Sequence, residues 1–463
     1  MGKLLAGAAK VRLTPPQSIL DEMSANGSYT SFKGVYKDVY ARCIALSNGA
    51  ETFLVYSVEL GSFPAQRRFR EVVQQELGIH PDAVMLGNTH NHQCVNAGDD
   101  SEAPPKSGDQ INAPKNPVLE EINERLIQFF HECCLQAARE AIAKMVPAKM
   151  GYASGESYIN ASRDWDTPIG GLQNSDYSGY SDRELVVMKV DSLDGEPIGM
   201  VVNFGVHSNM LYIYRFNDEF PLICGDIAGE IMEFVENASA GRYVCAWVEA
   251  AAGDQNPLMM GTSFGVQANP DGSFTRTQKN LSAQSTIVLM EHLAQVQGLE
   301  ILNTANKITA MSSDFELKYA RCEYPIPGIV NARTYFNLAF KGGDDTSGKT
   351  KFEVTPDEYA AMERVSTDPL VFKFHLAVLN GLAFCGINTE PYSYLGRIIK
   401  DVLPYPKAMV FAIDAGHLGY LPDVRKAEKL GFGTLDSHAE TPWDVERAIY
   451  EGFRDLARKL QKK

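Results

Sequence analysis

The sequence predicts an α/β fold with helices packed on mixed β-sheets, and three observations support that prediction. Short apolar runs alternate with amphipathic stretches over most of the 463 residues, the pattern of strands that alternate with helices. Between residues 118 and 145 the apolar residues recur at helical spacing, which indicates a long helix lying on a sheet. Hydrophobic residues make up 44% of the chain and charged residues 22%, the balance of a soluble globular protein.

The expected strands are short apolar runs on both sides of that long helix. Before it come residues 53–58 and 83–86, and after it come residues 200–206, 243–251, 383–387 and 408–413. A last amphipathic helix is expected at residues 442–460. Residues 92–117 are expected to be the most loop-like stretch, and a second loop-rich region is expected at about 255–278.

The length and the charge limit the domain count and the partners. At ~150 residues per domain the length allows three domains, but one large α/β unit fits equally well. Acidic residues outnumber basic ones, 58 against 43, so the formal net charge is −15 at pH 7. This charge repels a phosphate backbone, and we therefore expect no nucleic-acid partner. No segment holds the ~20 apolar residues that a membrane span needs.

The first residues and the cysteines indicate a cytoplasmic protein. The apolar run after Lys3 is interrupted by Lys10 and Arg12 before the core of a secretory signal can form. Ala6 occupies the position at which N-myristoylation requires Ser or Thr. The eight cysteines include no C-x-x-C pair, so we expect free thiols in a reducing compartment.

Polar residues of catalytic type follow four of the expected strands. They are His90 with His92, then His207, Asp254 and Glu390. Ligands collect at the carboxyl ends of strands in α/β folds, so this repeated placement predicts a shared site. In extended chain His90 and His92 project to one face, and His207 and Glu390 would complete a His/His/carboxylate zinc site. The alternative, a hydrogen-bonded histidine pair without metal, stays open at this point.

The other histidines are given structural roles. His131 lies among the apolar residues of the long helix and is expected to pack in the core. No role is assigned to His417. Surface or flanking positions are expected for His80, His292, His375 and His438.

Residues 343–350 match the phosphate-loop pattern G-x-x-x-x-G-K-[ST] letter for letter. A phosphate loop runs directly into a helix, whereas residues 351–354 read as extended chain. Asp344 and Asp345 would also repel the phosphates. We therefore expect a solvated hairpin tip here rather than a nucleotide site.

Four short segments share the motifs of one known family, in that family's order. They are Asn-Thr-His-Asn-His at 88–92, Asn-Phe-Gly-Val-His at 203–207, Glu-Pro-Tyr-Ser at 390–393 and Gly-His-Leu-Gly-Tyr-Leu-Pro at 416–422. Each resembles a segment of the neutral/alkaline (non-lysosomal) ceramidases, and residues 6–16 resemble the first strand and turn of that family. The resemblance implies a ceramidase-type catalytic domain.

The resemblance also implies roles for individual residues. It implies a zinc ion (Zn²⁺) held by His90, His207, Glu390 and Tyr420. His92 would then contact a ligand or the substrate rather than the metal. Arg163, in Asn-Ala-Ser-Arg at 160–163, comes close to a family arginine and is the candidate for substrate binding.

The chain departs from the family pattern at the nucleophile. The family's Gly-Asp-Val-Ser-Pro-Asn segment corresponds here to Gly-Asp-Gln-Asn-Pro-Leu at 253–258, so Asn256 stands where the attacking serine would be. An amide side chain is no such nucleophile, but Asn256 can orient water or donate a hydrogen bond to an oxyanion. We expect Asp254 or His92 to handle the proton.

These features predict a cytoplasmic zinc-dependent hydrolase of an amide or ester bond. The family's C-terminal sandwich domain and secretion signal have no counterpart, so residues 1–463 are expected to form one catalytic domain acting on a soluble small-molecule substrate. Two alternatives stay open. One is a metal-dependent lyase or isomerase acting on a sugar or cyclitol-like substrate, and the other is a non-catalytic zinc-binding homologue.

Overall fold

The computed structural model describes residues 2–28, 32–98, 116–168, 170–215, 218–331, 364–427 and 437–462. Its largest element is a mixed sheet of eight strands. In spatial order these are β13 (Val244–Glu249), β11 (Pro197–Phe204), β10 (Glu184–Ser192), β7 (Val146–Glu156), β2 (Leu5–Arg12), β4 (Tyr40–Ser47), β5 (Thr52–Val58) and β6 (Val84–Asn88). The pairs β5–β6 and β11–β13 are parallel, and the other pairs are antiparallel.

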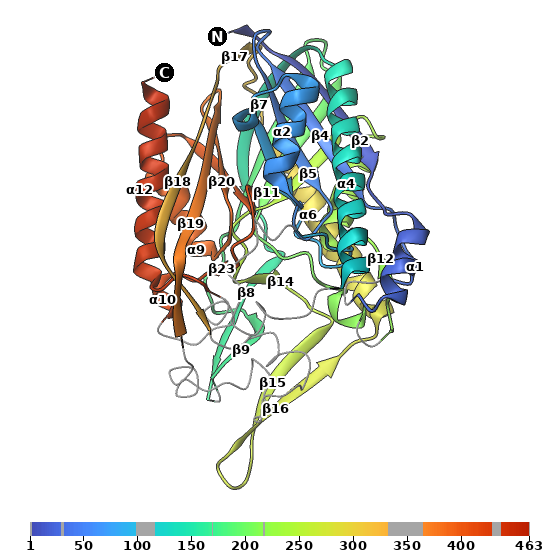
Figure 1. The fold of residues 1–463 in the computed structure, drawn as a ribbon, viewed down its shortest axis with the longest axis vertical. Coiled ribbons are helices and arrows are strands. Elements are labelled where there is room, and N and C mark those ends of the chain that lie inside the picture. Colours follow the sequence, from blue (N-terminus) through green and yellow to red (C-terminus); the bar gives the residue numbers. More distant parts are fainter. Residues whose placement is uncertain are drawn as a thin grey trace.

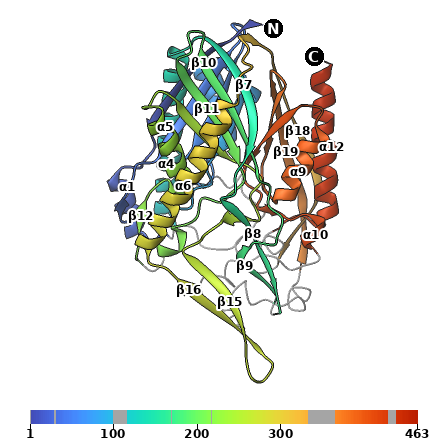
Figure 2. The same ribbon diagram turned by 180° about the vertical axis from the view of Figure 1, so that it is seen from behind.

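Helices cover both faces of this sheet (Figures 1 and 2). α4 (Pro117–Ala143) and α2 (Gln66–Leu77) lie on the face seen in Figure 1, and α5 (Asp226–Ala238) and α6 (Ala283–Asn306) lie on the other. The Asn116 side chain caps α4 by accepting a hydrogen bond from the backbone N–H of Val118 at 3.1 Å. The apolar stripe of α4 is buried against the sheet, as the sequence predicted.

A second sheet of four strands lies beside the first (Figure 1). Its order is β18 (Leu317–Asn331), β19 (Arg364–Leu379), β20 (Leu382–Ile387) and β22 (Lys407–Ala412). Two helices accompany it, α9 (Ser393–Val402) and α12 (Pro442–Gln461). α12 packs on β18 and β19, and the Oγ1 of Thr441 caps it by accepting from the N–H of Asp444 at 3.1 Å.

Asn203 connects the two sheets through its side chain. This residue of β11 is buried, and its Nδ2 donates to the carbonyl of Val410 in β22 at 2.7 Å. Its Oδ1 accepts from the N–H of the same Val410 at 2.9 Å. The open edge of β22 is thus satisfied by an amide from the first sheet, as buried backbone groups require.

The remaining elements are short. The small sheets are β1 (Gly2–Lys3) with β17 (Asp314–Phe315), β3 (Gly34–Val35) with β12 (Leu222–Ile223), β14 (Gln255–Pro257) with β8 (Asn160–Thr167) and β9 (Gly170–Asp176), β15 (Thr262–Ala268) with β16 (Phe274–Asn280), and β21 (Glu390–Pro391) with β23 (Tyr420–Leu421). The other helical segments are α1 (Gln17–Ala25), α10 (Val424–Ala427) and the 3-10 turns at Pro81–Ala83 and Tyr212–Arg215. The β15–β16 hairpin projects from the body at the end opposite the two termini (Figures 1 and 2).

The predicted α/β fold class is confirmed, together with the strands and helices on which it rested. The predicted strands correspond, with boundaries shifted by a few residues, to β5, β6, β11, β13, β20 and β22. The predicted helices correspond to α4 and α12. These elements were predicted from the periodicity of apolar residues alone, without the resemblance to a family.

Two expectations were wrong. The stretch at about 255–278, expected to be loop-rich, consists mostly of β14, β15 and β16, because residues 262–268 and 274–280 pair across the turn at 269–273. His375 is buried rather than on the surface, since its Nδ1 lies 2.9 Å from Oδ2 of Asp414 within the core. The phosphate-loop pattern at 343–350 and residues 99–115 of the other predicted loop lie outside the described residues.

Within the described ranges, no helix is both long and apolar enough to cross a membrane. All eight cysteines are free thiols, and all but Cys322 are buried. His131 packs in the core, as predicted, with its ring stacked on that of Phe63 at a centroid distance of 5.5 Å.

Candidate metal centre

The loops that follow β6 and β11 bring three histidines together. Asn91 and Ser208 form a parallel bridge between these loops, and the N–H of His92 donates to the carbonyl of Ser208 at 2.9 Å. His90 and His92 lie on the first loop and His207 on the second. The carboxyl ends of two strands from one sheet thus meet at a common place, as predicted.

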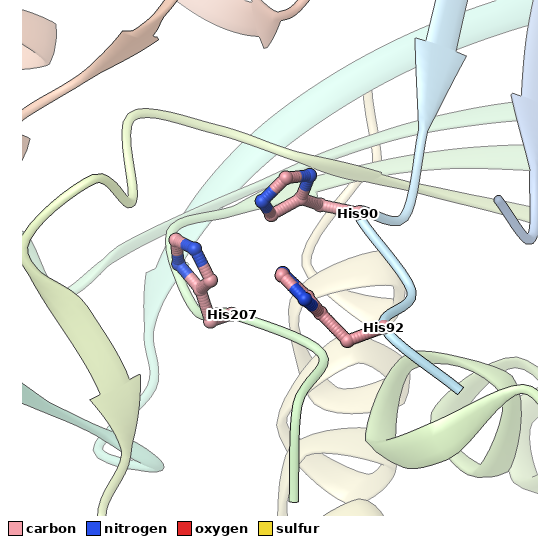
Figure 3. A group of neighbouring side chains, drawn as sticks. All are labelled: His90, His92 and His207. Atoms are coloured by element: carbon pink, nitrogen blue, oxygen red, sulfur yellow. The ribbon is translucent and has the colours of Figure 1, made fainter. Parts of the chain in front are cut away.

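The three imidazole rings surround one small space. One ring nitrogen from each of His90, His92 and His207 lies within 4.8 Å of the others. Figure 3 shows the rings turned toward one another, with centroids 4.6 Å apart for His90–His92 and 4.7 Å for His90–His207. Nitrogen atoms that converge in this way are a typical donor set for a transition metal.

Glu390 adds a carboxylate oxygen to this space from the second sheet. Its Oε2 lies 3.1 Å from Nε2 of His90 and 3.3 Å from Nε2 of His207. Both Nε2 of His90 and Oε2 of Glu390 are buried and have no hydrogen-bond partner among the described residues. Buried polar atoms are rarely left unpaired, so this pair of atoms fits the binding of a metal cation.

Backbone carbonyls fix which nitrogen of each histidine faces that space. Nδ1 of His90 donates to the carbonyl of Gly61 at 2.7 Å, and Nδ1 of His207 donates to the carbonyl of Ala252 at 2.8 Å. In the neutral form of both rings, Nε2 is then the nitrogen left to bind a metal. Burial lowers the pKa of His90, but the charges of Glu390 and Glu249 outweigh it and raise that pKa to about 9, so a metal at Nε2 would displace a proton. Metal-bound histidines almost always show this second hydrogen bond. The residues present therefore fit a metal ion with nitrogen and oxygen ligands.

Tyr420 and Arg163 lie at one side of the cluster. Tyr420 pairs with Glu390 in the short β21–β23 sheet, and its hydroxyl lies 3.5 Å from Nε2 of His207. The guanidinium of Arg163 is buried 5.2 Å from the centre of the Tyr420 ring, and its Nε donates to the carbonyl of Gly253 at 2.9 Å. The positive charge of Arg163 thus lies beside the phenol.

Asp254 and Asn256 follow the end of β13, next to the loop of His207. Both carboxylate oxygens of Asp254 accept hydrogen bonds from Ser393, from its N–H at 2.7 Å and from its hydroxyl at 2.9 Å. Oδ1 of Asn256 accepts from Nδ2 of Asn209 at 3.3 Å. Asp254 therefore holds the start of α9, while the amide group of Asn256 is left to donate elsewhere.

The electrostatics of the cluster favour a bound positive charge. Burial raises the pKa of Glu390, but the charge of His90 and the neighbouring rings of His207 and His417 outweigh it and hold that pKa well below its usual range. Burial, with the neighbouring charges of His90 and His207, keeps the pKa of His92 well below the usual value. The carboxylate thus stays negative among imidazoles, as a metal site requires.

Two residues in the cluster were missed by sequence reasoning. Glu249, the last residue of β13, places Oε1 3.5 Å from Nδ1 of His207, and burial raises its pKa to about 8. His417 places Nε2 2.6 Å from Oε1 of Glu390. The strand-end position could have indicated Glu249, but no local pattern distinguishes His417 from a surface histidine.

No family model and no curated protein matches the sequence. Solved structures of ceramidases share its fold. A neutral ceramidase from Pseudomonas aeruginosa matches with a TM-score of 0.71 and 14% sequence identity, over 100% of this chain and 75% of that one. A ceramidase complexed with C2 matches with a TM-score of 0.71 and 14% identity, over 100% of this chain and 76% of that one. The predicted ceramidase-type fold is confirmed by this likeness.

Proposed function

We propose that this chain is a zinc-dependent hydrolase that cleaves an amide or ester bond in a soluble small-molecule substrate. One observation supports it above all: Nε2 of His90, Nε2 of His207 and Oε2 of Glu390 converge, and two of these buried atoms have no hydrogen-bond partner among the described residues. Two histidines and a carboxylate are the protein ligands of many catalytic zinc sites, in which a further position stays open for water. The fold shared with the ceramidases fits the same class of reaction.

In this proposal His90, His207 and Glu390 hold the metal, with Tyr420 as the fourth ligand. The hydroxyl of Tyr420 lies next to Nε2 of His207, and the charge of Arg163 beside the ring favours an ionised phenol oxygen. When bound, zinc would lower the pKa of a water molecule towards ~7 and polarise a substrate carbonyl.

The other residues have roles of their own. His92 is the better placed of the two candidate proton carriers, because its buried Nε2 has no hydrogen-bond partner among the described residues. Both oxygens of Asp254 are already engaged by Ser393. Asn256 is proposed to donate to the developing oxyanion and Arg163 to bind the substrate.

Several broader features belong to the same proposal. The ligands come from both sheets, which supports residues 1–463 as a single catalytic unit rather than separate domains. We propose a cytoplasmic location because all eight cysteines are free thiols. A small-molecule substrate fits a site whose metal-facing groups are buried.

The metal content of the purified protein tests the proposal. We expect one zinc per chain in the wild type, and its loss in His90→Ala and in Glu390→Gln. His292→Ala is the matched control, because His292 is exposed on α6, away from the cluster. Absence of stoichiometric zinc from the wild type, or zinc unchanged in Glu390→Gln, would contradict the proposal.

The class of reaction needs a second measurement. With a panel of N-acyl and ester substrates in H₂¹⁸O, hydrolysis places one solvent oxygen in the acid product. Turnover without solvent oxygen would instead indicate the lyase or isomerase alternative. Zinc binding with no turnover on any substrate would indicate a non-catalytic homologue.

A further inference from the structure

His417 connects the buried carboxylate of Glu390 to the surface of the molecule. Its side chain is 34% exposed, whereas that of Glu390 is 3% exposed. Its Nε2 donates to Oε1 of Glu390 at 2.6 Å. This is a short, charge-assisted hydrogen bond, and bonds of this kind orient a carboxylate strongly.

The two oxygens of Glu390 therefore have different surroundings. Oε1 is bound by His417, while Oε2 lies near Nε2 of both His90 and His207 and accepts no hydrogen bond from the described residues. A carboxylate with two free oxygens can bind a metal through one of them or through both. Here Oε2 is the oxygen that faces the histidine nitrogens, and Oε1 already accepts one strong hydrogen bond.

The loop that carries His417 is held at both ends. The side chain of Gln66, which is buried, donates to the carbonyl of Ile413 at 2.7 Å and accepts from the N–H of Ala415 at 2.5 Å. After His417, the N–H of Leu418 donates to the carbonyl of Asn388 at 2.8 Å. His417 is thus fixed by backbone contacts that do not involve its own ring.

The same loop is tied to the strand of Glu390. The N–H of Glu390 donates to the carbonyl of Gly419 at 2.9 Å, and Glu390 pairs with Tyr420 in the β21–β23 sheet. Gly419 adopts a φ of 81°, a left-handed conformation that glycine takes without strain. Backbone hydrogen bonds thus hold the strand of the carboxylate directly against the loop of the imidazole that binds it.

We propose that His417 is a positioning residue for the metal centre: by holding Oε1 of Glu390, it leaves Oε2 as the single oxygen offered to the metal. The inference rests on the proposed zinc site and adds a residue to it. Hydrogen-bond partners of metal ligands typically contribute 10–100-fold to metal affinity, because they fix the orientation of the ligand. A histidine that merely covered the surface would contribute to folding and not to metal binding.

Three variants separate these roles. His417→Ala removes the hydrogen bond, His417→Gln retains a side-chain N–H donor of similar reach, and His292→Ala is the control for loss of an exposed histidine. Zinc affinity is measured by chelator competition on the full chain, and the absorption spectrum of the cobalt-substituted protein reports ligand geometry. Neither measurement depends on activity.

We expect His417→Ala to weaken zinc binding by about 10–100-fold and to change the cobalt spectrum. His417→Gln should stay within about threefold of the wild type and keep its spectrum, as should His292→Ala. The melting temperature of the metal-free protein should be the same in all four, which separates positioning from a general loss of stability. If His417→Ala does not fold, His417→Asn, whose amide is too short to reach Oε1, takes its place with the same expected loss.

Each outcome has a clear meaning. Zinc affinity and cobalt spectrum unchanged in His417→Ala would overturn the role of His417 and leave the zinc proposal intact. A loss of affinity in His417→Gln equal to that in His417→Ala would also overturn it, because the hydrogen bond is retained. A wild-type protein that binds no zinc would overturn the proposed function first, and this inference with it.

Discussion

At the scale of single residues, His92 and Tyr420 are the two candidates for the fourth ligand of the proposed zinc. A buried nitrogen of His92 belongs to the cluster of three histidines, whereas the hydroxyl of Tyr420 lies 3.5 Å from Nε2 of His207. Imidazole is the commoner zinc ligand. The buried charge of Arg163 beside the Tyr420 ring nevertheless favours a phenolate, and two variants distinguish the two residues.

We predict that Tyr420→Phe weakens zinc binding by about tenfold or more, because it removes an oxygen ligand without changing the packing of the ring. His92→Gln should leave zinc affinity within a few-fold and lower kcat by about 10²-fold or more, as expected for loss of a proton carrier. Chelator competition and steady-state kinetics measure the two effects. The reverse pattern would make His92 the ligand and Tyr420 a substrate contact.

Part of the proposed metal site could be predicted from the sequence. His90, His207 and Glu390 were predicted to meet because each follows an apolar run, and strand ends collect at one edge of a sheet. Glu249 and His417 were missed. Their importance depends on which atom they face, and a distance between side chains more than 20 positions apart has no trace in local spacing. Asp254 was identified by position, but its hydrogen bonds to Ser393 could only come from the fold.

At the scale of elements, α4 carries a titratable group inside its apolar stripe. His131 stacks on Phe63 and its Nε2 donates to the carbonyl of Pro64 at 2.9 Å. Burial lowers the pKa of His131 to about 4. The histidine of the unfolded chain has an ordinary pKa of ~6.5. Between that pH and about 4, His131 therefore binds a proton in the unfolded chain but stays neutral in the native protein.

The free energy of unfolding should therefore fall as the pH drops from 6.5 towards 4, and this residue alone accounts for about 2 kcal/mol between pH 7.5 and pH 5. His131→Phe removes the titration while keeping an aromatic ring against Phe63. Denaturant unfolding at the two pH values measures the fall in the free energy of unfolding. That fall should be about 2 kcal/mol smaller in the variant than in the wild type. His292→Ala, at an exposed position on the same fold, should keep the wild-type loss; equal losses in His131→Phe and wild type would contradict the assignment.

Elements were predictable where their pattern was long or strongly apolar. α4 and the core strands were identified because burial on one face or on both selects apolar residues at a fixed period. The β15–β16 hairpin was missed because its strands are mostly solvated, so Thr, Gln and Ser alternate there with few apolar residues. Its signal is the turn at Asn-Pro-Asp-Gly, residues 269–272, which is typical of a hairpin connection but was read only as loop.

At the scale of the whole molecule, the proposed metal lies where the two sheets meet. His90 and His207 follow strands of the eight-stranded sheet, while Glu390 and Tyr420 follow strands of the four-stranded sheet. The order of strands in either sheet, and the contact of Asn203 with the edge of β22, could not be read from the sequence. Pairing between distant segments depends on packing that local periodicity does not encode.

A metal bound at this junction should stabilise the two sheets as one unit. A ligand that binds only the native state raises the free energy of unfolding by about 2.7 kcal/mol when its free concentration is 100 times its Kd. We expect chelation of zinc to lower the melting temperature of the wild type and to speed amide hydrogen exchange at the ends of β6, β11 and β20. Differential scanning calorimetry and hydrogen-exchange mass spectrometry measure the two effects.

Two variants separate the metal from the rest of the junction. Glu390→Gln should lose the zinc-dependent rise in melting temperature. Asn203→Leu leaves both the N–H and the carbonyl of Val410 without their partner and should cost about 3 kcal/mol in the metal-free protein, yet it should retain the rise with zinc. The two effects should add in the double variant, because a ligand and a distant hydrogen bond contribute independently. Zinc that stabilised Glu390→Gln as much as wild type would place the metal away from the junction.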